Sequence, residues 1–243
     1  MIRAVIFDMD GLMLDTERTS GEFQRQASEE RGIPYQDLKP LIMGRAVQEV
    51  RRIHLEHYGP DYPFEEIRAR ARELWDQYLL DHPVPVKPGL FPLLEYLDRQ
   101  DIPAAVATST ARDSALKLLD KAGIAPYLTA MVFGDMVERS KPEPDIFLRA
   151  AELLGAPPRC CMVLEDSPNG IRAAHRAGML PVMVPDLVQP DQELQKLLYR
   201  RLERLDQHVG PGDCNIAFDS QYCLCSEKSR GEKSLQQQAY ECN

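Results

Sequence analysis

The chain has 243 residues, a formal net charge of -9 and a pI near 5.1. This length is sufficient for one large domain, or for one domain that carries a modest insertion. Nucleic acids and membrane surfaces are themselves negatively charged, so the acidic balance argues against both as partners. Because Asp8 and Asp10 interrupt the only early apolar run, we find no signal sequence and expect a cytoplasmic protein.

The first expected strand covers residues 5–7 and ends just before Asp8-Met9-Asp10-Gly11. In open α/β sheets, ligands bind at the carboxyl ends of the strands. Side chains alternate along an extended chain, so Asp8 and Asp10 can point the same way, and one carboxylate can attack while the other handles a proton. Short motifs recur by chance, however, and an isolated Asp-x-Asp-Gly is more often an acidic turn that ends a strand.

After this strand the sequence becomes charged and helical. The pattern predicts helices over residues 17–31, 36–58 and 64–80, separated by turns rich in glycine and proline. We interpret residues 16–82 as a small α-helical cap domain inserted after the first strand. His54 and His57 are expected to be exposed, and Trp75 and Tyr78 to belong to the core of the cap.

From residue 83 onward, helices and strands alternate as in an α/β protein. The expected pairs are a helix over 90–99 with a strand over 103–107, 112–122 with 131–133, 144–154 with 160–164, and 168–177, capped by Ser167, with 181–184. Five apolar strands predict a doubly wound, Rossmann-like parallel sheet in a core formed by residues 1–15 and 83–205. Residues 206–243 lack periodicity and are predicted to be an irregular tail.

Polar side chains follow the expected strands at the points where these strands end. They are Asp8 with Asp10, Thr108 with Ser109, Lys141, and Glu165 with Asp166. Because the carboxyl ends of parallel strands meet at one rim of a sheet, we expect these side chains to lie together. A chain whose loops served only solubility would rarely place acids, hydroxyls and a lysine at four such ends.

These clusters resemble the motifs of the haloacid dehalogenase superfamily, in the subgroup with a helical cap, close to the β-phosphoglucomutase-like phosphatases. The similarity extends roughly over residues 1–200, and the stretches that carry it are 8–16, 106–109, 140–144 and 164–170. The resemblance implies a Mg²⁺-dependent phosphatase that acts on a small phosphorylated metabolite, such as a sugar phosphate or nucleoside monophosphate, through an aspartyl-phosphate intermediate.

The same resemblance assigns roles to the acids. Asp8 is the nucleophile, and Asp10 gives a proton to the leaving group and later takes one from water. The implied ligands of Mg²⁺ are Asp8, the main-chain carbonyl of Asp10, and Asp166, with Glu165 either bound directly or holding a metal-bound water. Taken alone, the Glu165-Asp166 pair is equally compatible with an acidic helix start.

The remaining candidates would bind the substrate. By resemblance Thr108 offers a hydroxyl to the oxygens of the transferred phosphoryl group, Ser109 assists, and Lys141 supplies a fixed positive charge. Alone, these residues would be interpreted as a helix cap and a solvated lysine. In the cap, Arg45 is either a contact for a polar group of the substrate or an ordinary surface arginine.

The alternatives concern the fate of the phosphoryl group. The sugar mutases that the chain resembles carry an arginine three residues after a glycine that corresponds to Gly44, and this chain has Val47 there. This difference weakens the alternative of a β-phosphoglucomutase-like mutase. An inactive binding module is the alternative of another class, and the loss of a catalytic group, which would favour it, is not observed. We expect a monomer whose partner is the metabolite.

Overall fold

The structure, a computed structural model, describes residues 2–42 and 47–207, and within these ranges the chain forms a sheet of six parallel strands. The strands are β1 (Ala4–Phe7), β2 (Ala104–Ala107), β3 (Ala130–Val132), β4 (Cys161–Glu165), β5 (Leu180–Met183) and β6 (Arg200–Arg201). Their order is β3-β2-β1-β4-β5-β6, so the sheet extends in both directions from β1. The predicted α/β class with a doubly wound parallel sheet is confirmed.

Side chains of the strands alternate between two hydrophobic clusters on opposite faces of the sheet. In β1, Val5 and Phe7 belong to one cluster, and Ala4 and Ile6 belong to the other. Helices α5 (Leu90–Arg99) and α6 (Arg112–Lys121) contribute to the first cluster, and α7 (Asp145–Leu153) and α8 (Pro168–Arg176) to the second. Both faces are therefore covered, which explains why β1, β2 and β3 are apolar along their whole length.

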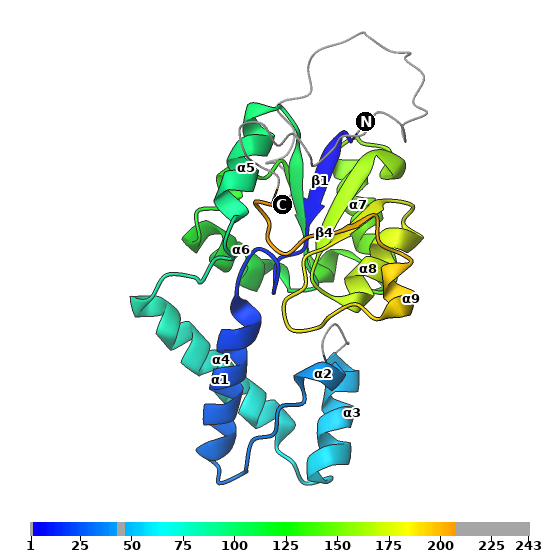
Figure 1. The fold of residues 1–243 in the computed structure, drawn as a ribbon. Coiled ribbons are helices and arrows are strands. Elements are labelled where there is room, and N and C mark those ends of the chain that lie inside the picture. Colours follow the sequence, from blue (N-terminus) through cyan, green and yellow to red (C-terminus); the bar gives the residue numbers. More distant parts are fainter. Residues whose placement is uncertain (1, 43–46, 208–243) are drawn as a thin grey trace.

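In the described part of the chain, four helices follow β1 and lie beyond the carboxyl ends of the strands (Figure 1). They are α1 (Thr16–Glu29), α2 (Lys39–Ile42), α3 (Val47–Tyr58) and α4 (Phe64–Asp81). Helices α1 and α4 pack together, with Phe23 against Trp75 and Tyr78. The two segments that connect these helices to the sheet are joined by a bridge between Leu14 and Val86.

An ion-pair cluster ties these connecting segments to the loop after β5. Lys87 Nζ lies 2.8 Å from Asp186 Oδ1 and 3.5 Å from Asp15 Oδ1. Arg18 Nη2, in the first turn of α1, lies 3.0 Å from the same Asp186 oxygen, and the Asp186 side chain is only 1% exposed. A buried carboxylate with two cationic partners therefore fixes the start of α1 relative to the sheet.

Three local predictions differ from the structure. The helix expected over 36–58 begins only at Lys39, as α2, because a proline at position 40 is tolerated only in the first turn of a helix. The part of this prediction over residues 43–46, between α2 and α3, lies outside the described residues. Besides three short 3-10 helices, two short elements of the described residues were not predicted: β6, which consists of two arginines, and α9 (Gln192–Gln195). Helix α9 is capped by Asp191, whose Oδ1 accepts a hydrogen bond of 2.7 Å from Leu194 N.

The prediction that His54 is exposed is wrong, because its side chain is buried. The His54 Nδ1 atom lies 2.8 Å from the carbonyl oxygen of Val50, and the ring packs against Tyr62 and Phe64. His57 is exposed, as predicted. A turn after α3 brings the aromatic rings over His54, and this contact carries no signal in the helical periodicity of the sequence.

The predicted tail, residues 206–243, lies outside the described residues from position 208 onward. The helices that the structure describes are each too short or too polar to traverse a lipid bilayer. The cellular compartment stays a prediction.

Replacement of a buried core residue tests the two-faced core. Phe147 is fully buried in α7, so Phe147→Ala is expected to lower the free energy of unfolding by about 3–5 kcal/mol in denaturant titrations. The neighbouring Leu148 is 40% exposed, and Leu148→Ala is expected to change the free energy of unfolding by no more than about 0.5 kcal/mol. Equal losses in the two variants would contradict the described packing of α7.

Candidate active site

The candidate site lies at the carboxyl ends of β2, β1 and β4. The strand order reverses at β1, and this is where an open α/β sheet forms a crevice for ligands. Asp8 follows β1 directly, Thr108 follows β2, and Glu165 is the last residue of β4 with Asp166 next to it. Lys141 reaches the same place from the loop that precedes α7.

A buried ammonium group occupies the centre of the site. Lys141 Nζ donates hydrogen bonds to Asp8 Oδ1 at 2.5 Å, to Glu165 Oε1 at 2.8 Å and to the carbonyl oxygen of Ala107 at 3.1 Å. It also lies 4.8 Å from the centre of the Phe147 ring. Burial by itself lowers the pKa of an ammonium group, but Asp8 and Glu165 outweigh it and hold the pKa of Lys141 above its usual range. Lys141 is therefore a fixed positive charge.

The site nevertheless contains more negative than positive charge. Carboxylate oxygens of Asp8, Glu165 and Asp166 all lie within 4.8 Å of one another. Burial raises the pKa of the Asp8 carboxyl despite the opposing effect of Lys141, and the charges of Glu165 and Asp10 raise it further. A single ammonium group does not offset these acids. The oxygen donor set and its excess charge fit a divalent cation such as Mg²⁺.

Two glycines allow the acids to approach so closely. A Cβ atom on Gly170, in the first turn of α8, would lie 1.7 Å from Glu165 Oε1. Gly11 has a φ of +83°, and a Cβ atom there would lie 2.3 Å from Asp166 Oδ2. The second oxygen of Glu165 accepts a hydrogen bond of 2.8 Å from the backbone N–H of Ser167, which caps α8 as predicted.

Three hydroxyl groups hold the carboxylate of Asp10. Thr16 Oγ1 donates to Asp10 Oδ1 at 2.7 Å, Thr110 Oγ1 donates to Oδ2 at 2.7 Å, and Thr108 Oγ1 lies 3.4 Å from the same oxygen. No role for Thr16 or Thr110 was predicted from the sequence. The sequence feature that could have indicated Thr110 is its spacing of two residues from Thr108. The same spacing separates Asp8 from Asp10 and allows two side chains to point the same way.

Most of the predicted site residues meet at this rim. The structure brings together Asp8, Asp10, Thr108, Lys141, Glu165 and Asp166. Ser109 is adjacent in the chain, but its side chain is exposed. Arg45 lies outside the described residues. The chemical roles of all these residues remain predictions.

Comparison with known proteins identifies the family. Residues 2–178 match the model of the haloacid dehalogenase-like hydrolases. The chain belongs to this family. It is 36% identical over 183 residues to "Phosphorylated carbohydrates phosphatase" of Thermotoga maritima, which covers 73% of this chain and 82% of the relative.

Two further comparisons indicate the subgroup to which this haloacid dehalogenase-like hydrolase belongs. It is 37% identical over 188 residues to "Probable pseudouridine-5'-phosphatase" of Drosophila melanogaster, which covers 74% of this chain and 80% of the relative. The crystal structure of β-phosphoglucomutase from Clostridium difficile superimposes with a TM-score of 0.68 at 26% identity, over 85% of this chain and 93% of that one. The predicted family and subgroup are confirmed, and the named phosphatases support the predicted class of phosphomonoester hydrolases.

Removal of the central ammonium group tests the electrostatics of the site. Lys141→Met leaves Asp8 and Glu165 buried without their cation, and is expected to cost about 3–5 kcal/mol of stability at neutral pH without divalent ions. The loss should decrease as the pH falls, because protonation neutralises the unpaired carboxylates. Lys117 forms an exposed pair with Asp76, so Lys117→Met should cost at most about 1 kcal/mol.

Denaturant titrations of both variants at two pH values measure this difference. Losses of the same size in the two variants would show that Lys141 does not stabilise the buried carboxylates of Asp8 and Glu165.

Proposed function

We propose that the protein is a Mg²⁺-dependent phosphatase that hydrolyses a small phosphorylated metabolite through an aspartyl-phosphate intermediate. The observation that carries the proposal is the buried Asp8 carboxylate, which is held by Lys141 next to Glu165 and Asp166. Phosphate monoesters resist hydrolysis so strongly that a two-step covalent route is a large advantage.

Asp8, Asp166 and the main-chain carbonyl of Asp10 would hold the metal ion, with Glu165 bound directly or through water. When bound, the ion offsets the charges that a carboxylate and a phosphate share and stabilises the oxygens of the phosphoryl group. Lys141 contributes a second, permanent positive charge, since its pKa is held high by the same acids.

The chain's own residues account for both chemical steps. An oxygen of Asp8 forms a bond to phosphorus while the bond to the leaving oxygen breaks, and Asp10 transfers its proton to that oxygen. In the second step water attacks phosphorus, Asp10 accepts a proton from it, and the bond between Asp8 and phosphorus breaks. Thr16 and Thr110 orient Asp10 for both proton transfers.

We also propose that residues 1–205 of the chain divide into two domains. Residues 16–82 form a cap, and residues 1–15 and 83–205 form the core. Contacts across this division support a closed site: Arg72 of α4 donates to Ser114 of α6, and Lys117 Nζ lies 2.7 Å from Asp76 Oδ1. A cap over the carboxyl ends of the strands excludes water other than the attacking molecule.

A mutase is the second candidate, and the likeness to β-phosphoglucomutase favours it. Val47, at the position where the mutases that the chain resembles carry an arginine, weighs against it. The relatives named for phosphorylated carbohydrates and for pseudouridine 5'-phosphate are phosphatases. Hydrolysis of a sugar or nucleoside phosphate is therefore the function that we propose.

Loss of the nucleophile should abolish turnover. Asp8→Asn is expected to release no phosphate above background from a panel of phosphomonoesters, and Asp10→Asn to reduce kcat by about 10²–10⁴-fold, because it can no longer transfer a proton. Asp61 is exposed, so Asp61→Asn serves as the control with unchanged turnover. Phosphate release by Asp8→Asn at the parental rate would rule out the assigned nucleophile.

The product separates the two candidates in the same assay. With β-glucose 1-phosphate, the parent is expected to yield inorganic phosphate, and accumulation of glucose 6-phosphate would support the mutase instead.

Removal of divalent cations should silence the enzyme. We expect EDTA to abolish phosphate release and added Mg²⁺ to restore it. Mg²⁺ should also raise the thermal unfolding temperature of the parent but not of Asp166→Asn, since an ion that binds only the folded state stabilises it. Full activity in the presence of EDTA would contradict the requirement for a metal.

A further inference from the structure

The loop after β2, residues 108–111, connects Asp10 to the segment that follows β3. Three atoms of Thr110 form hydrogen bonds here. Its hydroxyl donates to Asp10 Oδ2 at 2.7 Å, its backbone N–H donates to Thr108 Oγ1 at 3.0 Å, and its carbonyl oxygen accepts from the backbone N–H of Gly134 at 3.1 Å. A single residue therefore links the end of β3 to the group that would transfer the proton.

A glycine is required at position 134 because two main-chain segments approach closely there. A Cβ atom on Gly134 would lie 2.2 Å from the carbonyl oxygen of Ser109 and 2.8 Å from its carbonyl carbon. Both are backbone atoms, which cannot rotate away as the end of a flexible side chain can. The φ angle of Gly134 lies outside the left-handed region, so the close approach alone excludes a side chain. A larger residue at this position would displace the loop.

Asp135, the next residue, binds the chain just after this loop. Its Oδ2 accepts a hydrogen bond of 3.2 Å from the backbone N–H of Arg112, the first residue of α6. Ala111, at the N-cap position, offers no side-chain acceptor, so Asp135 supplies the acceptor and the negative charge that the start of a helix favours. The Arg112 guanidinium carbon in turn lies 5.7 Å from the centre of the Phe133 ring. Residues that follow β3 therefore hold the loop at two points.

We infer that Gly134 and Asp135 are positioning residues for the proton transfers of Asp10, and that they act through Thr110. This inference rests on the proposed phosphatase function. A general acid must lie within about 2.6–3.2 Å of the oxygen that receives its proton, so a small displacement of the hydroxyl group that orients Asp10 is costly. The end of β3 thereby takes part in the reaction together with the ends of β2, β1 and β4.

The nature of the leaving group separates this role from a merely structural one. The alkoxide that leaves a sugar or nucleoside phosphate needs a proton from Asp10, whereas p-nitrophenolate is a weak base and leaves without one. The ratio kcat/KM covers the steps up to the departure of the leaving group, so the later attack of water does not enter it. A misplaced Asp10 therefore lowers kcat/KM for an alkyl phosphate more than for p-nitrophenyl phosphate.

Variants of the two residues test the inference on both esters. Gly134→Ala is expected to lower kcat/KM about 10- to 100-fold for the preferred sugar or nucleoside phosphate, but less than about threefold for p-nitrophenyl phosphate. Asp135→Ala should show the same selectivity with a loss of about three- to tenfold, because Asp135 is exposed and the contact of Gly134 remains. Asp135→Asn keeps an oxygen that accepts from Arg112, and should stay within about twofold of the parent.

A double variant tests whether Thr110 transmits the effect. Thr110→Val removes the hydroxyl that binds Asp10, and should itself lower kcat/KM selectively for the alkyl ester. Adding Gly134→Ala to Thr110→Val should then cost less than about threefold, since residues that act through one contact have non-additive effects. Effects that multiply in full would show that Gly134 acts by another route, and would overturn the inference.

Gly123, just after the C-terminal end of α6, provides the matched control. Its φ is +71° and a Cβ atom there would meet nothing within 4 Å, so Gly123→Ala strains the backbone without displacing the loop. This variant should unfold at a lower temperature and keep kcat/KM for both esters within about twofold of the parent.

The possible outcomes distinguish the inference from the proposed function. Equal losses of Gly134→Ala on the two esters, or no loss on either, would overturn the inference but leave the phosphatase function in place. Should Gly134→Ala not fold, the comparison of Asp135→Ala with Asp135→Asn decides in the same way. A parent that hydrolyses neither ester would overturn the proposed function, and this inference with it.

Discussion

Buried carboxylates repel one another, and the site depends on the ammonium group of Lys141, which lies among them. Lys141 is packed against Phe147 and donates to Asp8 and Glu165, and this arrangement keeps a permanent positive charge out of water. The close packing of the acids in turn requires a glycine at position 170. The remaining negative charge is what a divalent cation would neutralise.

Parallel strands explain how distant segments supply this site. The carboxyl ends of β2, β1 and β4 meet where the strand order reverses, and each contributes polar groups immediately after its last apolar residues. Helices α1 to α4 lie beyond this rim, so residues that follow β1 can contact the side chains at the strand ends (Figure 1). Thr16 illustrates the connection, because it is the first residue of α1 and also binds Asp10.

Local patterns predicted most helices and strands but not the contacts between them. The helix over Leu90–Arg99 was predicted with its exact limits, since its apolar spacing and flanking glycine are local properties. The burial of His54 was missed, because it depends on the rings of Tyr62, in the turn after α3, and of Phe64, at the start of α4. Strand β6 has no apolar pattern and exists only through its pairing with β5. The pattern of polar strand ends supplied the candidate acids together with Lys141, and the resemblance to a family supplied their roles.

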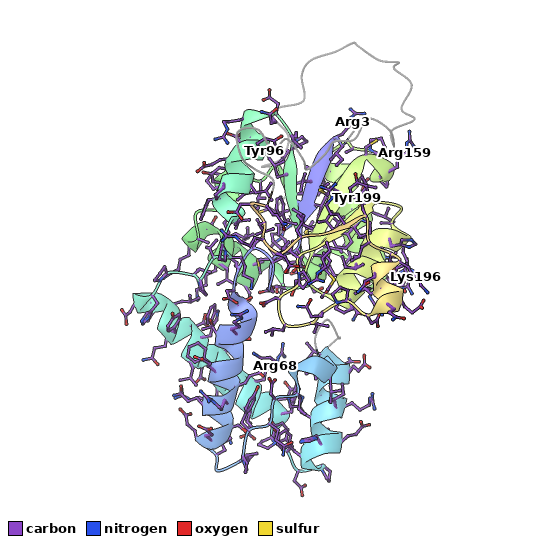
Figure 2. All side chains as sticks on the ribbon, viewed as in Figure 1. Arg3, Arg68, Tyr96, Arg159, Lys196 and Tyr199 are labelled. Carbon is purple, nitrogen blue, oxygen red and sulfur yellow. The ribbon has the colours of Figure 1, made fainter. Side chains whose placement is uncertain are left out.

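The sequence by itself determined the alternation of helices and strands and the polar groups at the ends of β1, β2 and β4, because hydrophobic periodicity and short motifs are encoded by neighbouring residues. Only the tertiary structure decided which hydroxyl groups hold Asp10: Thr110 lies 100 positions away in the chain, and its contact exists only when β1 and β2 pair. The same holds for the cavity that Gln24 and Arg68 both line, because α1 and α4 must pack together to form it (Figure 2).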